Sequence, residues 1–189
     1  MIMPVYNGFH PILQKKTNPI THITDDVKTL IKNMFETLYN IASGVGLAAN
    51  QVGSSHSLFI VDVSEIDEYA DTSKLIFINP EIISYSSETD FYNEGCLSFP
   101  AFYEDVERPI GVTMKYYDVD MNEIKQEFSG FLARVVQHEY DHLQGIVFYE
   151  KLSSFRKTLS NGKLKKIKSS YFEVDYDMIS PTGNLISST

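Results

Sequence analysis

The feature that most constrains this chain is a His-Glu-x-x-His pattern formed by His138, Glu139 and His142. The surrounding residues 131–143 carry apolar side chains at helical spacing. On a helix, side chains four positions apart lie on the same face, so both imidazoles can reach one metal ion. The carboxylate beside the first histidine can carry a proton to or from a reacting group. The pattern predicts a helix that holds a catalytic metal, although an amphipathic surface helix can also carry these residues.

A catalytic metal normally keeps three protein ligands and one open position, so a third ligand has to come from elsewhere. No histidine follows His142, which disfavours a third imidazole downstream. Cys96 is the only cysteine, and Gly95 before it allows a close approach of the backbone. A lone cysteine is equally at home as a small buried apolar residue. Glu150, close to the end of the predicted helix, is the alternative ligand.

A third segment, residues 44–51, is rich in small residues and reads Gly-Val-Gly-Leu-Ala-Ala-Asn-Gln. Small side chains let a substrate or another backbone approach closely. A phosphate-binding loop is the rival interpretation, but no Lys-Ser/Thr pair follows and the glycine spacing is not that of a dinucleotide-binding loop. Tight packing against a helix is the remaining structural explanation.

Taken in this order, three segments resemble the motifs of the peptide deformylase family: residues 44–51, residues 94–98 (Glu-Gly-Cys-Leu-Ser) and residues 137–142 (Gln-His-Glu-Tyr-Asp-His). The resemblance extends over roughly residues 5 to 150, judged by motif order. It implies a metal-dependent hydrolase that removes the N-formyl group from the N-terminal methionine of newly synthesised proteins and releases formate.

The resemblance also implies a role for each matching residue. Cys96, His138 and His142 would bind the metal, and Glu139 would be the general acid and base. The family is commonly described as ferrous, so Fe(2+) is the expected native ion, with Zn(2+), Ni(2+) or Co(2+) as alternatives.

For the substrate, the resemblance implies oxyanion donors and a binding cleft. Gln51 and the backbone N–H of Leu97 would hold the formyl oxygen as it gains negative charge. Two glycines, Gly46 and Gly95, would bind the extended peptide through their backbones. The candidates for the methionine pocket are three apolar residues: Val45, Phe131 and Val135.

The pattern of expected elements favours an α+β fold, because helices and strands are mixed without a regular βαβ alternation. We expect antiparallel sheets packed around a central helix that carries the His-Glu-x-x-His motif. The expected elements are a helix over 25–42, strands over 56–63 and 75–79 with Pro80 as the stop, paired strands over 110–118 and 124–128, and the helix over 131–143.

A length of 189 residues is typical of one domain, so we expect a single catalytic domain over 1–189. Within this domain, the part from about residue 153 to 189 consists of a basic segment, a late strand over 171–178 and a polar tail. We therefore expect a C-terminal strand rather than a long C-terminal helix. The basic segment is either a solvated surface or a docking site for ribosomal RNA; its cations are Arg156, Lys157, Lys163, Lys165, Lys166 and Lys168.

Charge and cysteine content bear on partners and location. A net charge of −9 argues against broad binding to DNA or RNA backbones, and the apolar runs are too short to cross a membrane. One cysteine excludes an intrachain disulfide and suits a reducing compartment, and no signal peptide is evident. We expect a cytoplasmic protein whose partners are N-formylmethionyl nascent peptides and, transiently, the ribosome, with no DNA and no membrane.

Three other interpretations remain at this point. A metallopeptidase would explain the His-Glu-x-x-His pattern but would leave Cys96 and Gln51 without a role. A catalytically silent relative that binds formyl-Met peptides would be expected to have lost a residue such as Glu139, and no such loss is seen. A structural metal site usually has four ligands, and only three are found.

Overall fold

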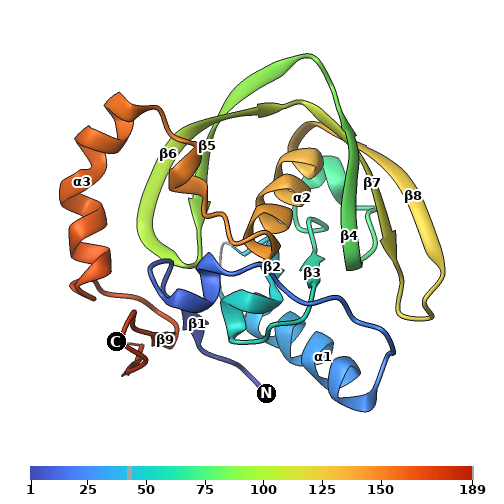
Figure 1. Cartoon of the computed structure of the whole chain (residues 1–189), viewed down its shortest axis with the longest axis horizontal. Coiled ribbons are helices and arrows are strands. Elements are labelled where there is room, and N and C mark those ends of the chain that lie inside the picture. Colours follow the sequence, from blue (N-terminus) through green and yellow to red (C-terminus); the bar gives the residue numbers. More distant parts are fainter. Residues whose placement is uncertain (42–43, 189) are drawn as a thin grey trace.

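The largest part of the fold is a five-stranded antiparallel sheet (Figure 1). The structure is a computed structural model that describes residues 1–41 and 44–188. The strands of the sheet lie in the order β2-β3-β4-β7-β8. Their bounds are β2 Gly46–Ala48, β3 Leu58–Val61, β4 Leu75–Tyr85, β7 Gly111–Tyr117 and β8 Glu123–Ser129. The predicted pairing of 110–118 with 124–128 is confirmed as β7 and β8.

Two smaller sheets complete the β-structure. Strands β5 (Thr89–Cys96) and β6 (Phe99–Pro109) form a long antiparallel hairpin that the sequence analysis did not predict. Strands β1 (Val5–Tyr6), β9 (Met178–Ile179) and β10 (Leu185–Ile186) form the third sheet, in which β1 and β9 are parallel. The two ends of the chain therefore meet in one sheet (Figure 1).

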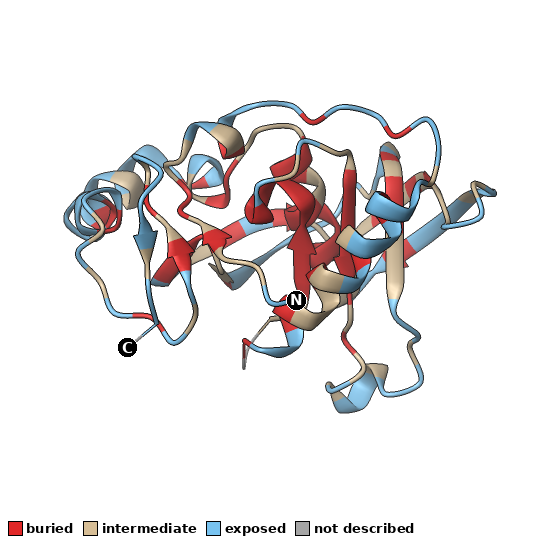
Figure 2. Ribbon diagram, turned by 90° about the horizontal axis from the view of Figure 1, so that it is seen from below, coloured by how far each residue is buried: buried red, intermediate tan, exposed pale blue. Residues whose placement is uncertain are grey.

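Helix α2 (Gly130–Leu143) lies at the centre of the molecule, where most of its residues are buried (Figure 2). It packs on one face of the five-stranded sheet, against an aromatic cluster that includes Phe59 and Phe77, whose ring centroids are 4.4 Å apart. Gly145, just beyond the helix, has φ 76°, a left-handed conformation that glycine adopts without strain. The predicted central helix is confirmed.

Helix α1 (Asp25–Tyr39) covers the opposite face of the same sheet. Thr24 caps it by accepting a hydrogen bond from the Val27 N–H at 3.3 Å. Strand β3 is buried on both faces: Phe59 and Val61 face α2, and Leu58 and Ile60 pack with α1. The helix ends three residues before the predicted boundary, and residue 42 lies outside the described residues.

The prediction that Pro80 ends a strand is wrong, because β4 continues to Tyr85. The register against β7 is irregular between Ile78 and Glu81, and Asn79 has φ 49°. A proline is tolerated in a strand where the ladder is interrupted, since no N–H has to be donated there.

The C-terminal part combines a helix and a strand. The basic segment, for which no helix was expected, forms helix α3 (Ser154–Lys168), with Ser160, Leu164 and Ile167 buried. A C-terminal strand is present as predicted, but it comprises Met178 and Ile179 rather than 171–178.

Four short 3-10 helices are described in addition: η1 Pro11–Gln14, η2 Ala49–Val52, η3 Asp67–Tyr69 and η4 Phe148–Lys151. Within the described residues, no helix is both long and apolar enough to span a membrane.

Candidate metal centre and substrate cleft

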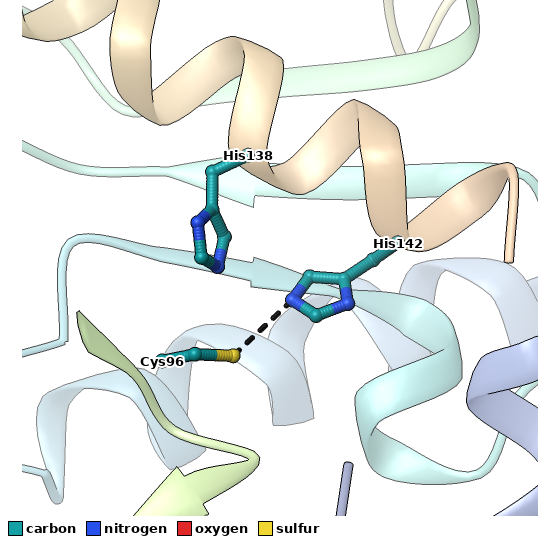
Figure 3. A group of neighbouring side chains, drawn as sticks. All are labelled: Cys96, His138 and His142. Atoms are coloured by element: carbon teal, nitrogen blue, oxygen red, sulfur yellow. Dashed lines mark hydrogen bonds between the residues drawn. The ribbon is translucent and has the colours of Figure 1, made fainter. Parts of the chain in front are cut away.

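The structure brings Cys96, His138 and His142 together (Figure 3). Cys96 ends β5, and the two histidines lie one turn apart on α2. One ligand atom from each lies within 4.8 Å of the others, and the Cys96 Sγ is 3.3 Å from the His142 Nε2. Glu150, the alternative ligand, is exposed on η4 and is not part of this cluster. The cluster has the composition and spacing of a three-ligand metal site.

The surroundings of the two imidazoles fit a divalent ion. The His138 Nδ1 lies 3.0 Å from a Glu94 carboxylate oxygen, which fixes the ring so that its Nε2 faces the cluster. Burial lowers the pKa of His142 well below its ordinary value, which keeps that imidazole neutral and able to ligate. Against the effect of burial, hydrogen bonds with Cys96 and Glu94 raise the pKa of His138, and a bound cation would compete with that proton.

Glu139 lies beside the cluster with one carboxylate oxygen, Oε2, buried and without a hydrogen-bond partner among the described residues. Burial raises the pKa of Glu139 to about 7. A Cβ on Gly46 would lie 2.7 Å from the Glu139 Oε1, so only a glycine at position 46 leaves room for this carboxylate. The carboxylate is therefore placed to exchange protons near neutral pH.

The side chain of Gln51, on η2, is oriented by a hydrogen bond from a nearby backbone N–H. Its Oε1 accepts a hydrogen bond from the Ala48 N–H at 2.8 Å, which turns the Nε2 group toward the hairpin. That Nε2 lies 3.2 Å from the Ser98 Oγ and 3.6 Å from the Cys96 Sγ. The amide donor is thus held next to the candidate metal ligands.

A network of buried charges supports the site, and the sequence analysis missed it. Glu94 accepts hydrogen bonds from Arg108 at 2.7 and 3.1 Å and from Arg134 at 2.7 Å, in addition to its contact with His138. Arg108 also donates to Asp141 at 2.6 Å. Burial would raise the pKa of Glu94, but His138 and Arg108 hold it well below its ordinary value. One signal was available: Arg134 precedes His138 by four positions and so shares its helical face.

A cleft of about 700 Å³ opens over this site. Every predicted site residue except His142 lines this cleft. The lining residues among them are Val45, Gly46, Gln51, Gly95, Cys96, Leu97, Phe131, Val135, His138 and Glu139. The cleft is also lined by residues that the sequence analysis did not single out, among them Tyr92 and Tyr103 on the hairpin and the C-terminal residues 173–176.

A thiol and two imidazoles converging beside a buried carboxylate, at the floor of a cleft, define a metal-dependent hydrolase of the His-Glu-x-x-His class. Comparison with known proteins narrows this class. The family model described as polypeptide deformylase matches residues 2–158. This chain belongs to the polypeptide deformylase family, whose members are metalloenzymes that remove the N-formyl group from the N-terminal methionine of nascent chains.

Individual relatives agree with the family match. A peptide deformylase of Salinibacter ruber is 40% identical and covers 100% of both chains, and one of Christiangramia forsetii is 40% identical over 97% of this chain and 98% of its own. Among solved structures, a Legionella pneumophila peptide deformylase superposes with a TM-score of 0.80 at 34% identity, covering 90% of this chain and 97% of that one. A plant peptide deformylase gives a TM-score of 0.83 at 30% identity, with coverages of 89% and 90%. The predicted family, fold class and enzyme activity are confirmed, and the rival interpretations are not favoured.

Proposed function

We propose that the cleft over Cys96, His138 and His142 is the active site, in which this chain hydrolyses the formyl amide of N-formylmethionyl peptides. The observation that carries the proposal is the convergence of three metal-ligand atoms next to Glu139, one of whose carboxylate oxygens has no hydrogen-bond partner among the described residues, beside a cleft that Cys96, His138 and Glu139 line. Neither a silent binding protein nor a structural metal site requires a buried carboxylate with one unsatisfied oxygen, because such an oxygen costs stability.

The three ligands would hold one divalent ion. When bound, such an ion supplies Lewis-acid activation of water at neutral pH. A thiolate with two imidazoles suits several first-row ions. We infer Fe(2+) as the native ion, with Zn(2+), Ni(2+) or Co(2+) as substitutes. The contact of His138 with Glu94 would keep that ligand oriented during turnover.

Glu139 would move the proton. In deformylation, water adds to the formyl carbon, the carbon–nitrogen bond breaks, and the departing amine needs a proton. A carboxylate with a pKa of about 7 can take a proton from water and return it to the amine at neutral pH. This proton completes the free amine of the peptide. The formic acid formed then loses its own proton, so that the products are the formate anion and a protonated N-terminus.

Gln51 and Leu97 would stabilise the formyl oxygen as negative charge develops on it. The Gln51 Nε2 is already held in place by the bond that its own Oε1 accepts from Ala48, so little reorganisation is needed. The Leu97 N–H belongs to the turn that follows Cys96 and lines the same cleft. Two donors directed at one oxygen are the usual arrangement for acyl transfer.

The peptide would bind along strand edges. Gly46 lies on β2, the edge strand of the five-stranded sheet, and Gly95 lies on β5, at the other side of the cleft. An extended peptide can add to such edges through backbone hydrogen bonds. Val45, Phe131 and Val135 line the cleft and would receive the apolar methionine side chain.

We further propose that residues 1–189 act as one catalytic domain in the cytoplasm, where formylated nascent chains are made. The cations of α3 would provide a transient contact with the ribosome, and we expect no DNA or membrane partner. The six cations of residues 156–168 lie on or at the end of one helix, which concentrates positive charge in a chain of net charge −9.

The test is formate release from a formyl-Met tripeptide by protein loaded anaerobically with Fe(2+), compared with its Glu139→Ala variant. We expect release by the parent protein and a loss of at least about a hundredfold in kcat for the variant, with bound metal unchanged. An exposed glutamate, Glu65→Ala, is the matched control and should behave as the parent. A folded, metal-loaded parent protein that releases no formate would overturn the proposed function.

A further inference from the structure

One wall of the cleft comes from outside the region that the family model matches. That region ends at residue 158, whereas residues 173–176 line the cleft. These residues follow α3 and lead into β9 (Figure 1). Their contribution therefore belongs to the C-terminal segment of this chain rather than to the three motifs.

The C-terminal segment is held firmly against the rest of the fold. Met178 pairs with Val5 in the parallel β1–β9 ladder. Val174 and Met178 are buried in a cluster with Val5 and Ile41, and Leu97 packs against the same cluster. Buried apolar contacts and a strand ladder on either side of residues 175–177 fix the backbone from which Tyr176 extends.

Tyr176 contacts the proposed oxyanion turn directly. Its hydroxyl donates a hydrogen bond of 2.7 Å to the Leu97 carbonyl. Burial raises the pKa of Tyr176, so the hydroxyl stays protonated and remains a donor at neutral pH. The phenol ring also lines the cleft, so one side chain both forms the wall and restrains the turn.

Three segments distant in sequence hold the turn by hydrogen bonds. Leu97 and Ser98 form a two-residue turn that is closed by the pairing of Cys96 with Phe99, and the ladder register shifts just before it, between Gly95 and Cys96. Ser98 is held by the N-terminal segment, since its carbonyl accepts from the Gly8 N–H at 2.7 Å, and by Gln51 at its hydroxyl. The Leu97 carbonyl is held by Tyr176.

We propose that Tyr176 is a positioning residue for deformylation: by holding the Leu97 carbonyl, it fixes the turn and so aims the Leu97 N–H at the formyl oxygen. The inference rests on the proposed role of Leu97 in the active site. An oxyanion donor contributes only when its direction is set before the charge develops, and a turn free to rotate would lose part of that contribution.

The test compares Tyr176→Phe with the parent protein, both loaded with the same divalent ion and assayed for formate release from a formyl-Met tripeptide. We expect kcat per bound metal to fall about two- to tenfold, the range that one neutral hydrogen bond allows, with KM unchanged because the ring still forms the wall. Tyr176→Ala should in addition raise KM, because it removes the wall. Tyr171→Phe, at an exposed tyrosine in the same segment, is the matched control and should change neither.

Three outcomes would overturn the role of Tyr176: an unchanged kcat in Tyr176→Phe, a higher KM with unchanged kcat, or a loss of activity that only follows a loss of bound metal or of folded protein. Metal content and the urea midpoint of unfolding are therefore measured on each variant. If the parent releases formate and Gln51→Ala is impaired while Tyr176→Phe is not, only this inference fails. If the parent releases no formate, the proposed function fails first.

Discussion

At the scale of single residues, two buried carboxylates near the proposed metal ligands have opposite surroundings. Glu139 has one oxygen without a hydrogen-bond partner in the described part of the chain, and burial raises its pKa to about 7. Glu94 is surrounded by Arg108, Arg134 and His138, and its pKa lies well below the ordinary value. Burial alone disfavours a charged carboxylate, whereas nearby cations and donors favour it. Glu139 is therefore suited to exchange protons, and Glu94 to remain charged and orient a ligand.

A prediction for the single residue Gln51 follows from its proposed role as an oxyanion donor. We expect Gln51→Ala to lower kcat by about a hundred- to a thousandfold, the usual effect of removing one oxyanion donor, with a far smaller change in KM. The side chain is buried and its loss removes the acceptor of the Ala48 N–H, so the urea midpoint of unfolding is measured as well. The measurement is steady-state formate release by metal-loaded protein.

Gln14→Ala is the matched control for this prediction, because Gln14 is exposed on η1 and does not line the cleft. It should leave kcat and KM as they are in the parent protein. A Gln51→Ala variant with an unchanged kcat would remove Gln51 from the oxyanion site and leave the assignment of Glu139 untouched.

At the scale of elements, helix α2 joins the charge network to the proposed metal site. Arg134, His138 and His142 follow one another at intervals of four, so they lie on one face of the helix. The hairpin β5–β6 approaches that face and supplies Glu94 and Cys96 from one strand and Arg108 from the other. The site is thus formed where two rigid elements meet, which limits the motion of each ligand.

Helix α3 packs Leu164 and Ile167 against the apolar cluster of the hairpin and also makes polar contacts with β6. The polar contacts lead to a second prediction. Glu104 on β6 accepts hydrogen bonds from Ser160 at 2.5 Å and Arg156 at 2.9 Å. We expect Glu104→Gln to weaken this attachment, with hydrogen-exchange protection of the amides of 154–168 falling up to about fivefold, a modest effect because Arg156 is 43% exposed. Glu107→Gln, on the same strand but bonded to Thr89 rather than to α3, is the control.

The contribution of Glu104 should also depend on pH. The hydrogen bond from Ser160, followed by the effect of Arg156, lowers the pKa of Glu104 below its ordinary value of 4.5. A carboxyl group with a lowered pKa in the folded state stabilises that state above its unfolded pKa, and the effect is lost as the pH falls through the folded pKa. The difference between parent and Glu104→Gln should therefore be present at pH 7 and diminish below about pH 4.5. Equal protection of the two proteins at pH 7 would contradict this.

At the scale of the whole molecule, the proposed metal would join parts of the chain that are distant in sequence. Cys96 belongs to the hairpin and the two histidines to α2, so one ion would tie these elements together. An ion that binds only the folded state raises the free energy of unfolding. Chelation should lower the melting temperature of the metal-loaded protein by on the order of 10 °C.

The Cys96→Ser variant is the control for metal removal. It should bind the ion more weakly, and chelation should shift its melting temperature far less than that of the parent. Calorimetric melting with and without chelator, together with metal content, measures both effects. A Cys96→Ser variant that keeps its metal and its full response to chelator would show that another residue is the third ligand.

The sequence by itself determined the chemistry and the central element of this protein. Residue types at fixed spacing on one helix define which side chains share a face, because helical periodicity is local. The two histidines, Glu139 and the helix that carries them followed from that rule, and motif order pointed to Cys96 and Gln51. The predicted pairing of β7 with β8 depended on a short turn and was equally local.

Tertiary structure decided what depends on contacts between distant segments. Helix α3 has Ser, Asn and Gly in its sequence and too few apolar residues for a clear periodicity, so its docking on the hairpin could not be foreseen. The charge network needed Glu94, Arg108 and Arg134 to be buried together, which no local pattern encodes. The same holds for Tyr176, 79 residues from the Leu97 carbonyl that it contacts. Such contacts between distant segments depend on long-range packing rather than on local propensity, and the same packing brings the C-terminal residues into the wall of the cleft.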